Sequence, residues 1–248
     1  MNYYLGASRM NNQTVSSAFT LGVLICIGLS IFGYLLADSL PRMKALDRTV
    51  SVKGLSEKEV PADIAIWPVR FNIAENDLVK LFAGIEEKNA RVAEFLKARG
   101  FEDAEITISP PSVQDRHAQG YVNIRDIPFR YTANSTITVY TRKVDAVVDG
   151  MKQLIELGKH GVVILGEDYD PKAEFLFTGL NDLKPEMIEE ATRNAREVAE
   201  KFAHDSQSRL GKIRTASQGQ FSIDNRDSNT PYIKRVRVVS TVEYYLVD

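Results

Sequence analysis

A long apolar segment near the start of the chain contrasts with the alternating patterns that follow it. Between Arg9 and Asp38 lie 28 residues without a charged side chain or a histidine, and residues 18–37 are almost wholly apolar. A helix of about 20 residues extends about 30 Å, the thickness of the hydrocarbon layer of a bilayer. A buried core helix of this length would normally carry a polar face. The pattern therefore predicts a transmembrane helix at residues 18–37, in contact with membrane lipid.

The end of this segment favours an anchor over a cleaved export signal. A cleavable signal has an apolar region of about 7 to 15 residues, followed by small residues at the cleavage site. Leu35 and Ala37 would occupy the corresponding positions here, and leucine suits its position poorly. We therefore expect an uncleaved signal-anchor, with a cleaved and soluble protein as the alternative. The predicted organisation is a polar segment at residues 1–17, the span, a linker at residues 38–47 and a folded domain at residues 48–248.

The folded domain opens with two strand patterns. Residues 49–53 alternate apolar and polar side chains, as a half-buried strand does, and the alternation stops at Gly54. A second run at residues 64–73 is rich in strand-forming residues, and Pro68 within it indicates an edge or a bulge. Both runs are therefore predicted to be β-strands.

Three segments carry the three- and four-residue spacing of amphipathic helices. They are residues 77–100, 144–158 and 185–210. Asp77 is a suitable N-cap for the first helix, and Pro185 is acceptable in the first turn of the third. A glycine is expected to end each helix, namely Gly100, Gly158 and Gly211. In the third helix the predicted buried stripe is rich in alanine, so the backbone can approach a sheet closely.

Further strands and loops complete the pattern. The strands are predicted at residues 106–111, 131–140, 162–165, 213–221 and 235–247, with polar loops at residues 113–128 and 224–230. In residues 131–140 threonine and asparagine alternate with mostly apolar side chains, which predicts one polar and one apolar face. Hairpins mixed with helices in this order predict an α+β fold of mainly antiparallel sheets packed with three amphipathic helices.

Composition and charge exclude some classes of partner and of covalent stabilisation. The chain has 248 residues, with 31 lysines and arginines against 33 aspartates and glutamates. A protein that binds nucleic acid through its phosphates would normally carry an excess of basic residues, so we expect no nucleic-acid partner. The one cysteine, Cys26, lies inside the predicted span. The folded domain therefore has no thiol to oxidise and needs no disulfide.

Histidine and carboxylate spacing indicates no metal or cofactor site. The three histidines are His117, His160 and His204. None has a metal-ligand partner at helical or turn spacing, which favours surface histidines over a ligand or a general base. The acidic group Glu167, Asp168 and Asp170 resembles calcium ligands but lacks the glycine and bidentate glutamate of a dedicated loop. Solvated loop charges are the better interpretation.

A basic pair near the end of the chain is the remaining candidate. Arg235 and Arg237, with Lys234, Tyr232 and Tyr245 nearby, could contact phosphate or a partner subunit. On a net acidic domain we interpret them as a solvated or interface face. No glycine-rich phosphate loop, G-x-S-x-G elbow or H-E-x-x-H pattern is present. We therefore expect no catalytic, cofactor-binding or metal-binding residue and a protein that is not an enzyme.

Two rival functions stay open at this point. One is a ligand- or metal-binding hydrolytic enzyme that uses the acidic loop at residues 167–170 and a histidine. The other is an accessory subunit of a transport or secretion complex.

Several segments, taken in order, resemble the SIMPL-domain family of bacterial envelope proteins, a domain of unknown function that includes periplasmic immunogenic proteins. The resembling segments are VSVKG at residues 50–54, VPADIA at 60–65, the helix that ends at Gly100, residues 106–111 and 131–139, the alanine-rich helix at 191–203 with its LGKI exit at 210–213, and VSTV at 239–242. Together they span about residues 48–248.

The resemblance implies an exported α+β domain without established catalytic residues or cofactors. It also implies a tendency to form ring-like or channel-like homo-oligomers and a link to envelope or oxidative stress. Together with the predicted anchor, it leads us to expect a single-pass protein of the bacterial inner membrane. Its C-terminal domain would lie in the periplasm and self-assemble without catalytic activity.

Overall fold

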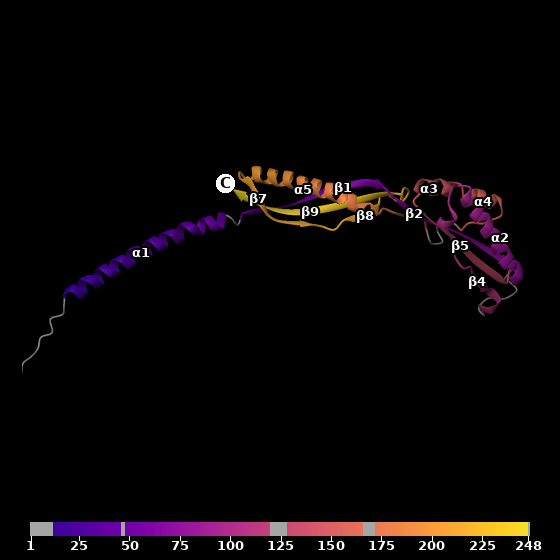
Figure 1. The fold of residues 1–248 in the computed structure, drawn as a ribbon, viewed down its shortest axis with the longest axis horizontal. Helices are drawn as coiled ribbons and strands as arrows, with labels where there is room; N and C mark the ends of the chain where they lie inside the picture. The colour runs from indigo at the N-terminus through magenta and orange to yellow at the C-terminus, as the bar shows by residue number, and fades with distance from the viewer. Residues whose placement is uncertain (1–11, 46–47, 120–127, 166–171, 248) are drawn as a thin grey trace, which may run out of the picture. The chain divides into compact units, whose positions relative to one another are not determined.

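The chain combines helices and strands in mixed order (Figure 1). The computed structural model describes residues 12–45, 48–119, 128–165 and 172–247. The elements, in chain order, are α1 (Asn12–Ala45), β1 (Thr49–Pro61), β2 (Ile64–Glu75), α2 (Leu78–Lys97), η1 (Asp103–Glu105), β3 (Ile106–Ile108), β4 (Ser112–Asp115), η2 (Arg116–Gln119), β5 (Tyr131–Thr141), α3 (Val144–Lys152), α4 (Ile155–Lys159), β6 (Glu174–Leu176), α5 (Leu180–Asp205), β7 (Arg209–Gln218), β8 (Ser222–Asn225) and β9 (Ile233–Val247).

The chain divides into two compact units. Unit 1 comprises Met1–Gly54, Thr192–Ser217 and Ser240–Asp248, and unit 2 comprises Leu55–Ala191 and Gln218–Val239. The strands β1 and β9 and the helix α5 each contribute residues to both units. Each unit buries its own apolar side chains, so the two cores are described separately.

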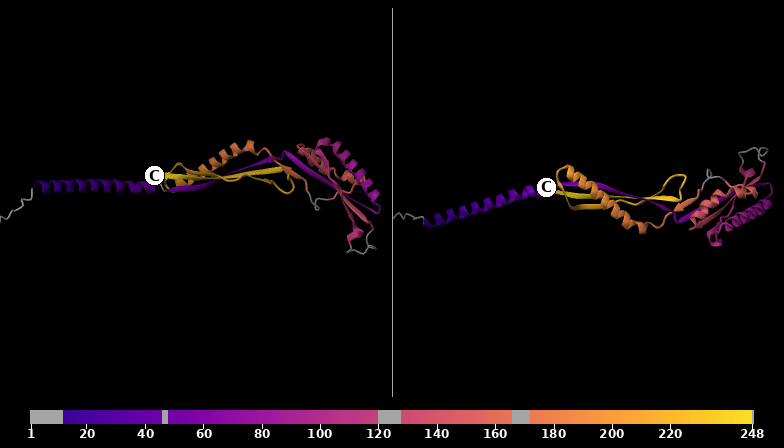
Figure 2. Two further views of the ribbon diagram at one scale, coloured as in Figure 1. Left: turned by 60° about the horizontal axis from the view of Figure 1, so that its bottom comes forward. Right: turned by 90° about the horizontal axis from the view of Figure 1, so that it is seen from above.

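Unit 2 contains a five-stranded antiparallel sheet. β5 pairs with β2 along its length, from Thr141 opposite Ala65 to Tyr131 opposite Glu75. β3 and β4 pair with the other side of β5, and β6 pairs with the first residues of β2. The helices α2, α3 and α4 lie on one face of this sheet (Figure 2). Burial alternates strictly from Ala133 to Thr141, so the predicted apolar and polar faces of this strand are confirmed.

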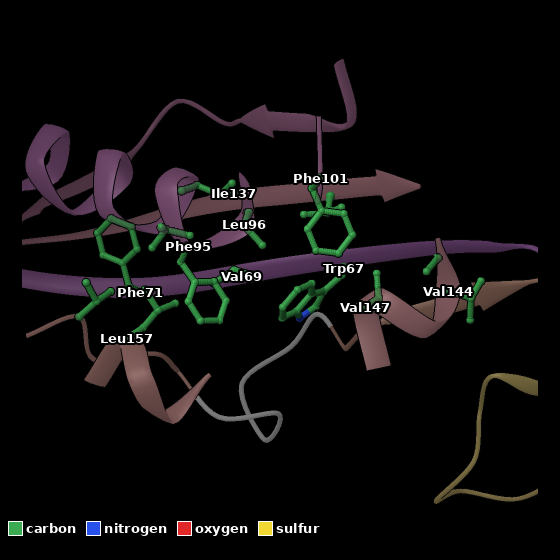
Figure 3. Close-up of a cluster of buried hydrophobic side chains, with 14 of the residues drawn as sticks. Trp67, Val69, Phe71, Phe95, Leu96, Phe101, Ile137, Val144, Val147 and Leu157 are labelled. Carbon is green, nitrogen blue, oxygen red and sulfur yellow. The ribbon is translucent and has the colours of Figure 1, made fainter. Parts of the chain in front are cut away.

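The core of unit 2 fills the space between this sheet and its three helices (Figure 3). Trp67, Val69 and Phe71 project from β2 into the core, and Phe71 is 0% exposed. The ring of Phe101 stands edge-on to that of Trp67, with centroids 6.2 Å apart. In α3, Gly150 gives the helix a close approach to Trp67, because a Cβ at this position would lie 3.0 Å from two of its ring carbons.

The helix α5 covers one face of the second sheet, whose strand order is β1, β9, β7 with β8 also paired to β9. In unit 1, Ala195 and Ala199 of this helix are buried against Val52, Val242 and Tyr244. Small side chains bring the helix backbone close to the strands, so burial of the predicted alanines is confirmed. Val198 and Phe202, predicted to belong to the same buried stripe, are 36% and 57% exposed, so that part of the prediction is wrong. Both sheets are antiparallel where their pairing is described and pack against helices, which confirms the α+β fold class.

The same helix packs on unit 2 through larger side chains. Met187 is 0% exposed and lies with Ala191 against Val60, Val236 and Val238. The side chain of Ser56, buried in β1, donates a hydrogen bond of 2.6 Å to Glu190. Buried apolar contact and a satisfied polar group therefore both fix α5 on the strands of unit 2.

Two predicted helix ends are confirmed on α2. Oδ1 of Asp77 accepts hydrogen bonds of 2.8 and 3.1 Å from the backbone N–H groups of Val79 and Lys80. At the other end, Gly100 has a φ of +86°. The N–H groups of Gly100 and Phe101 donate back to carbonyls of the last turn, the arrangement in which glycine takes the left-handed position.

Several strand predictions are wrong. β1 continues through Gly54 to Pro61, because Ser56 and Val60 extend the alternation and bury their side chains. The predicted polar loop at residues 113–128 begins instead with β4 and η2. β4 forms because its backbone pairs with β5, although its own sequence has no strand pattern. The predicted strand at residues 162–165 is reduced to a bridge from Ile164 to Phe71. The predicted strand at residues 213–221 is mostly β7, with β8 beginning after it.

Two helix predictions need correction. The second helix is divided into α3 and α4 and ends beyond Gly158, with Gly161 at a φ of +77°. The third helix begins at Leu180, so Pro185 lies inside it, and it ends at Asp205. Gly211 is part of β7, where a Cβ would lie 2.9 Å from the carbonyl oxygen of Tyr245. That glycine therefore permits close strand approach and does not end the helix.

The helix α1 contains the segment predicted to span a membrane. Its described apolar side chains are exposed, with values of 73% for Phe19, 68% for Leu24 and 76% for Tyr34. Among the residues that the structure describes, no helix has the combined length and apolar character needed to cross a membrane. The transmembrane helix at residues 18–37 is therefore not confirmed.

Candidate functional site

An open groove of about 1030 Å³ in unit 2 is the main candidate for a binding site. One wall is the side of α2 that carries Lys80, Gly84 and Lys88, and the remaining lining comes from β2, β4, β5 and the start of η2. At Gly84 the helix lies close to the side chain of Ile73, whose Cδ1 would be 2.5 Å from a Cβ at this position and would have to shift. The groove follows the end of β2, where no described strand pairs with the outer edge of residues 72–75.

Uncharged hydrogen-bonding side chains line the strand side of this groove. Asn72 lies opposite Asn134, and Gln114 lies opposite Thr132. Side chains that face each other across paired strands have Cβ atoms about 4.5–5.5 Å apart. No described residue forms a hydrogen bond with any of these four side chains. Their amide and hydroxyl groups are therefore available to a ligand.

Three cationic side chains complete the lining. Lys80 and Lys88 are two turns apart on α2, and Arg116 begins η2, directly after β4. Within the described residues, no ion pair or side-chain hydrogen bond engages these three groups. An arginine and two lysines without local partners raise the concentration of anions in a groove.

The two acidic residues of the groove are each held by a neighbour. Oε1 of Glu87 lies 2.6 Å from NH2 of Arg91, one helical turn away. Oε2 of Glu75 accepts a hydrogen bond of 3.2 Å from the backbone N–H of Asn76. Because Glu87 is neutralised by Arg91 outside the groove, the lining keeps an excess of positive charge.

A second hollow of about 450 Å³ lies between α2 and α4. The guanidinium of Arg99 stacks on the ring of Phe95, donates to its carbonyl oxygen at 3.0 Å and donates to Gln153 at 2.8 Å. Its buried Nε has no hydrogen-bond partner among the described residues. NH2 of Arg99 also lies 3.6 Å from Glu156. NH2 of this arginine therefore links the end of α2 to Gln153 and Glu156.

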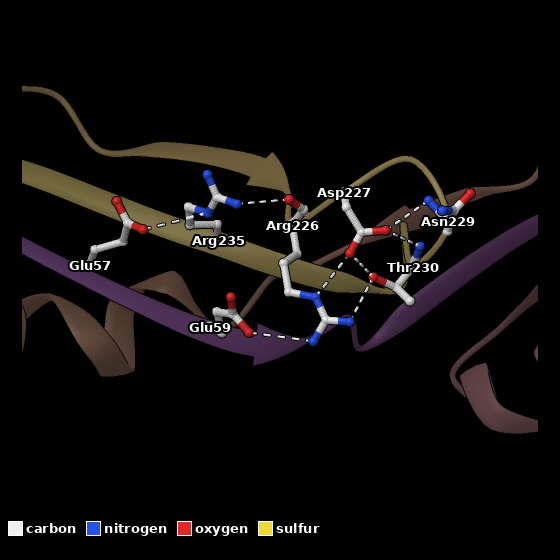
Figure 4. Close-up of polar contacts among 7 residues, drawn as sticks. All are labelled: Glu57, Glu59, Arg226, Asp227, Asn229, Thr230 and Arg235. Carbon is white, nitrogen blue, oxygen red and sulfur yellow. Dashed lines mark hydrogen bonds and ion pairs between the residues drawn. The ribbon is translucent and has the colours of Figure 1, made fainter.

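A polar network joins the β8–β9 hairpin to β1 within unit 2 (Figure 4). Arg235 lies 3.5 Å from Glu57, and Arg226 lies 3.5 Å from Glu59. Arg226 also pairs with Asp227 at 3.1 Å. Exposed ion pairs contribute little stability each, so we interpret the network as fixing the position of the hairpin.

Asp227 organises the turn of that hairpin. Its Oδ1 accepts hydrogen bonds of 2.8 Å from the N–H groups of Asn229 and Thr230, and its Oδ2 accepts from the Thr230 hydroxyl. That hydroxyl and the Arg226 guanidinium hold the pKa of Asp227 well below its usual range. Asp227 therefore stays ionised and serves the turn.

A row of polar side chains crosses the uncovered face of the other sheet in unit 1. Glu243 of β9 accepts hydrogen bonds from the Thr49 hydroxyl at 2.8 Å and the Thr215 hydroxyl at 3.1 Å, and it pairs with Arg214 at 3.1 Å. The bond from Thr49 is the main cause that lowers the pKa of Glu243, followed by Thr215 and Arg214. All three strands of unit 1 thus meet at one carboxylate.

Low pH is expected to weaken the hydrogen bonds and the ion pair that Glu243 forms in this row. A carboxylate with a lowered folded pKa stabilises the fold above its unfolded pKa, about 4.5 for Glu243, and the contribution is lost as the pH falls through the folded value. Denaturation midpoints measured from neutral pH down should therefore fall more steeply for the unmodified chain than for Glu243→Gln. Parallel pH profiles for the two proteins would contradict this assignment.

The three histidines lie on separate elements. His117 is in η2, and its backbone N–H donates to Asp115 at 3.0 Å. His160 follows α4 and offers its carbonyl oxygen to Arg91. His204 is in the last turn of α5 and lies 3.6 Å from Asp205. Among the described residues no three histidine, cysteine or acidic side chains cluster closely enough to hold a metal ion. Glu167, Asp168 and Asp170 lie outside the described residues.

The two arginines of the basic pair, Arg235 and Arg237, have different surroundings in the structure. Arg235 donates to the carbonyl oxygen of Arg226 at 2.7 Å in addition to its ion pair, while Arg237 is exposed. Lys234 is 8% exposed on the opposite face and donates to Asn225, and burial lowers the pKa of this lysine. Tyr232 packs edge-on against a buried phenylalanine, and Tyr245 belongs to the other unit. The five residues do not form one site.

Comparison with protein families decides the classification. Residues 50–243 match the family model named SIMPL, described as a protein of unknown function (DUF541). The chain belongs to the SIMPL family. Its SIMPL match begins one residue into β1 and ends within β9, so it includes the groove and most of both sheets and leaves α1 outside. A comparison with curated proteins found no match.

One residue of the resembling SIMPL segments has a clear structural role. Asp63, in the turn between β1 and β2, accepts hydrogen bonds of 2.9 and 2.8 Å from the N–H and hydroxyl of Thr178. The N–H of Asp63 donates to the carbonyl of Leu176, and that of Ala62 donates to Tyr232. The aspartate of the segment at residues 60–65 therefore ties the turn between β1 and β2, which lie in different sheets, to the entrance of α5.

The sequence pattern predicted only part of the lining of the groove in the SIMPL domain. The polar face of β5, with Thr132 and Asn134, follows from strand alternation, and the lysines lie on the polar side of a predicted helix. Gln114 and Arg116 fall in a segment predicted to be a loop, and nothing in their local pattern indicates the pairing of β4 with β5.

Proposed function

We propose that this SIMPL protein is a membrane-anchored, non-enzymatic protein of the bacterial envelope that acts by self-assembly. Residues 18–37 serve as the anchor in the inner membrane, and the SIMPL domain lies in the periplasm. The family resemblance suggests envelope or oxidative stress as the setting.

The anchor rests on sequence and on exposure. Residues 18–37 carry no charged side chain, and the described apolar side chains of α1 are largely exposed to solvent. An exposed apolar helix gains free energy from a lipid environment, at roughly 25 cal/mol for each Å² removed from water. This segment supports the proposal that the chain is held at a membrane.

Self-assembly rests on one observation, the uncovered edge strand β7. β7 pairs with β9 on one side, and no described strand pairs with its other side. Eight of its ten residues are exposed, including Ile213 at 49%. A long edge strand presents unpaired backbone groups that another strand can bind, and proteins usually cover such an edge. A second copy of the chain is the partner that we propose.

The absence of catalysis is supported by the placement of the chemistry. The described histidines lie on different elements, and the acid networks at Asp227 and Glu243 are occupied by neighbouring side chains. The groove in unit 2 contains no histidine among its described lining residues. These features favour binding and assembly over bond-breaking chemistry.

The mass of the full chain in a mild detergent tests the proposal. The unmodified protein should remain in membranes after an alkaline wash and sediment, once solubilised, as a defined oligomer. Ile213→Glu places a charge beside the edge and should shift the protein toward the monomer. Ile155→Glu is the matched control, because Ile155 is an exposed isoleucine on α4. A strict monomer, or release from membranes without detergent, would overturn the proposal.

The rival functions predict different outcomes. An accessory subunit would co-purify with a transport complex after mild detergent extraction, in place of a homo-oligomer. A hydrolytic enzyme built on Glu167, Asp168 and Asp170 would show a ligand-dependent rise in melting temperature that amide substitutions at these positions remove.

A further inference from the structure

We propose that the groove of unit 2 binds an acidic oligosaccharide, with carboxylate groups on the cations and hydroxyl groups on the uncharged side chains. The site consists of Lys80, Lys88 and Arg116 together with Asn72 and Asn134. This binding does not depend on self-assembly or on the anchor.

The charge of the groove selects an anion. Lys80, Lys88 and Arg116 line it without a described partner, whereas Glu87 is paired with Arg91 at 2.6 Å. The two lysines lie eight residues apart on α2, and a helix rises about 1.5 Å per residue. Their backbone positions are therefore about 12 Å apart. A ligand with repeated negative charges can contact both, whereas one small anion cannot.

The strand side of the groove selects hydroxyl groups. The amides of Asn72 and Asn134 face each other across β2 and β5, and Gln114 faces Thr132 across β4 and β5. Each amide offers two donors and an acceptor, so adjacent amides suit adjacent hydroxyls that both donate and accept. An extended peptide paired with the free edge of residues 72–75, which borders the groove, would leave these amides without hydroxyl partners, because a peptide carries few hydroxyl groups.

The size and openness of the groove fit a chain molecule. Pockets for small molecules usually enclose about 300–1,000 Å³ and bury most of the ligand. This groove has about 1030 Å³ and is open to solvent. A linear oligosaccharide can lie in it while its ends continue into solvent.

Binding of hexagalacturonate to the full chain, measured by calorimetry in detergent, tests the proposal. We expect a saturable interaction that weakens with added salt, because exposed charges are screened. Maltohexaose has the hydroxyls without the carboxylates, and hexaglutamate has carboxylates without the sugar hydroxyls. Both should bind at least about tenfold more weakly than hexagalacturonate.

Two sets of variants separate charge from hydroxyl recognition. Lys80→Gln, Lys88→Gln and Arg116→Gln combined should weaken binding about tenfold or more and reduce its salt dependence. Lys53→Gln, Arg193→Gln and Lys201→Gln remove the same charge elsewhere and should leave binding unchanged.

The second set is uncharged. The double variant Asn72→Ala with Asn134→Ala should weaken the binding of hexagalacturonate several-fold. It should leave any residual binding of hexaglutamate unaffected.

Three results would overturn the proposal. They are no binding of hexagalacturonate, equal loss in the control triple variant, and hexaglutamate binding as tightly as the sugar. The last would identify an acidic peptide as the ligand. Because none of the five substituted side chains belongs to a buried core cluster, unchanged circular dichroism should show that the variants remain folded.

Discussion

Replacing Phe71 by alanine is expected to lower the free energy of unfolding of unit 2 by about 3–5 kcal/mol. Phe71 is 0% exposed in the core between β2 and the helices. Its removal takes away apolar contacts and leaves a cavity that a close-packed core closes only in part. Trp67 is the only tryptophan and lies in the same core, so its fluorescence during chemical denaturation reports the unfolding of this unit.

A phenylalanine on the surface of the same unit supplies the control. Phe82 of α2 is 44% exposed, and Phe82→Ala should shift the denaturation midpoint far less than Phe71→Ala. Equal shifts for the two variants would show that the buried cluster is not the source of the stability of unit 2.

A larger side chain in the alanine stripe of α5 is the second substitution for which we expect a large effect on stability. Ala195 is 0% exposed where the helix meets Val52 and Val242 in unit 1. Ala195→Leu must push the helix away from the sheet or force strained side-chain conformations, at a cost of about 1–3 kcal/mol. Amide hydrogen exchange in residues 240–247 of β9 should accelerate roughly 5- to 160-fold, because local opening becomes easier by that free energy.

Leucine itself is not the cause of that effect, as a second substitution on the same helix should show. Val198 is 36% exposed, so Val198→Leu adds volume on the side away from the strands. The amide hydrogen exchange rates of β9 in the Val198→Leu variant should match those of the unmodified protein. If Ala195→Leu also leaves exchange unchanged, the close approach of α5 to unit 1 is not required for its stability.

Local signals predicted the ends of α2 correctly. A carboxylate before an apolar helical pattern can bond only to the first free N–H groups, as Asp77 does, and glycine tolerates the left-handed backbone found at Gly100. The same reasoning failed at Gly211, because a glycine also permits close approach between strands. Gln207, with a φ of 56°, takes the left-handed position after α5 instead.

The short strands show why other elements could not be predicted. β4 and β6 have four and three residues, and periodicity is not defined over so few positions. Each forms because a longer neighbour, β5 or β2, offers it backbone hydrogen bonds. The same dependence hid the groove, since Gln114 and Arg116 reach it only through the pairing of β4.

The amino-acid sequence by itself determined the α+β class, the two faces of β5, the caps of α2, the alanine stripe and the family resemblance. These features depend on alternation, helical spacing or the conformational preference of single residues, which act over a few positions. The tertiary structure alone decided how β1 and β9 contribute to both units, where β4 and β6 pair, and that Asn72, Lys88 and Arg116 line one groove. Those outcomes depend on contacts between residues far apart in the chain, whose free energy no local pattern contains.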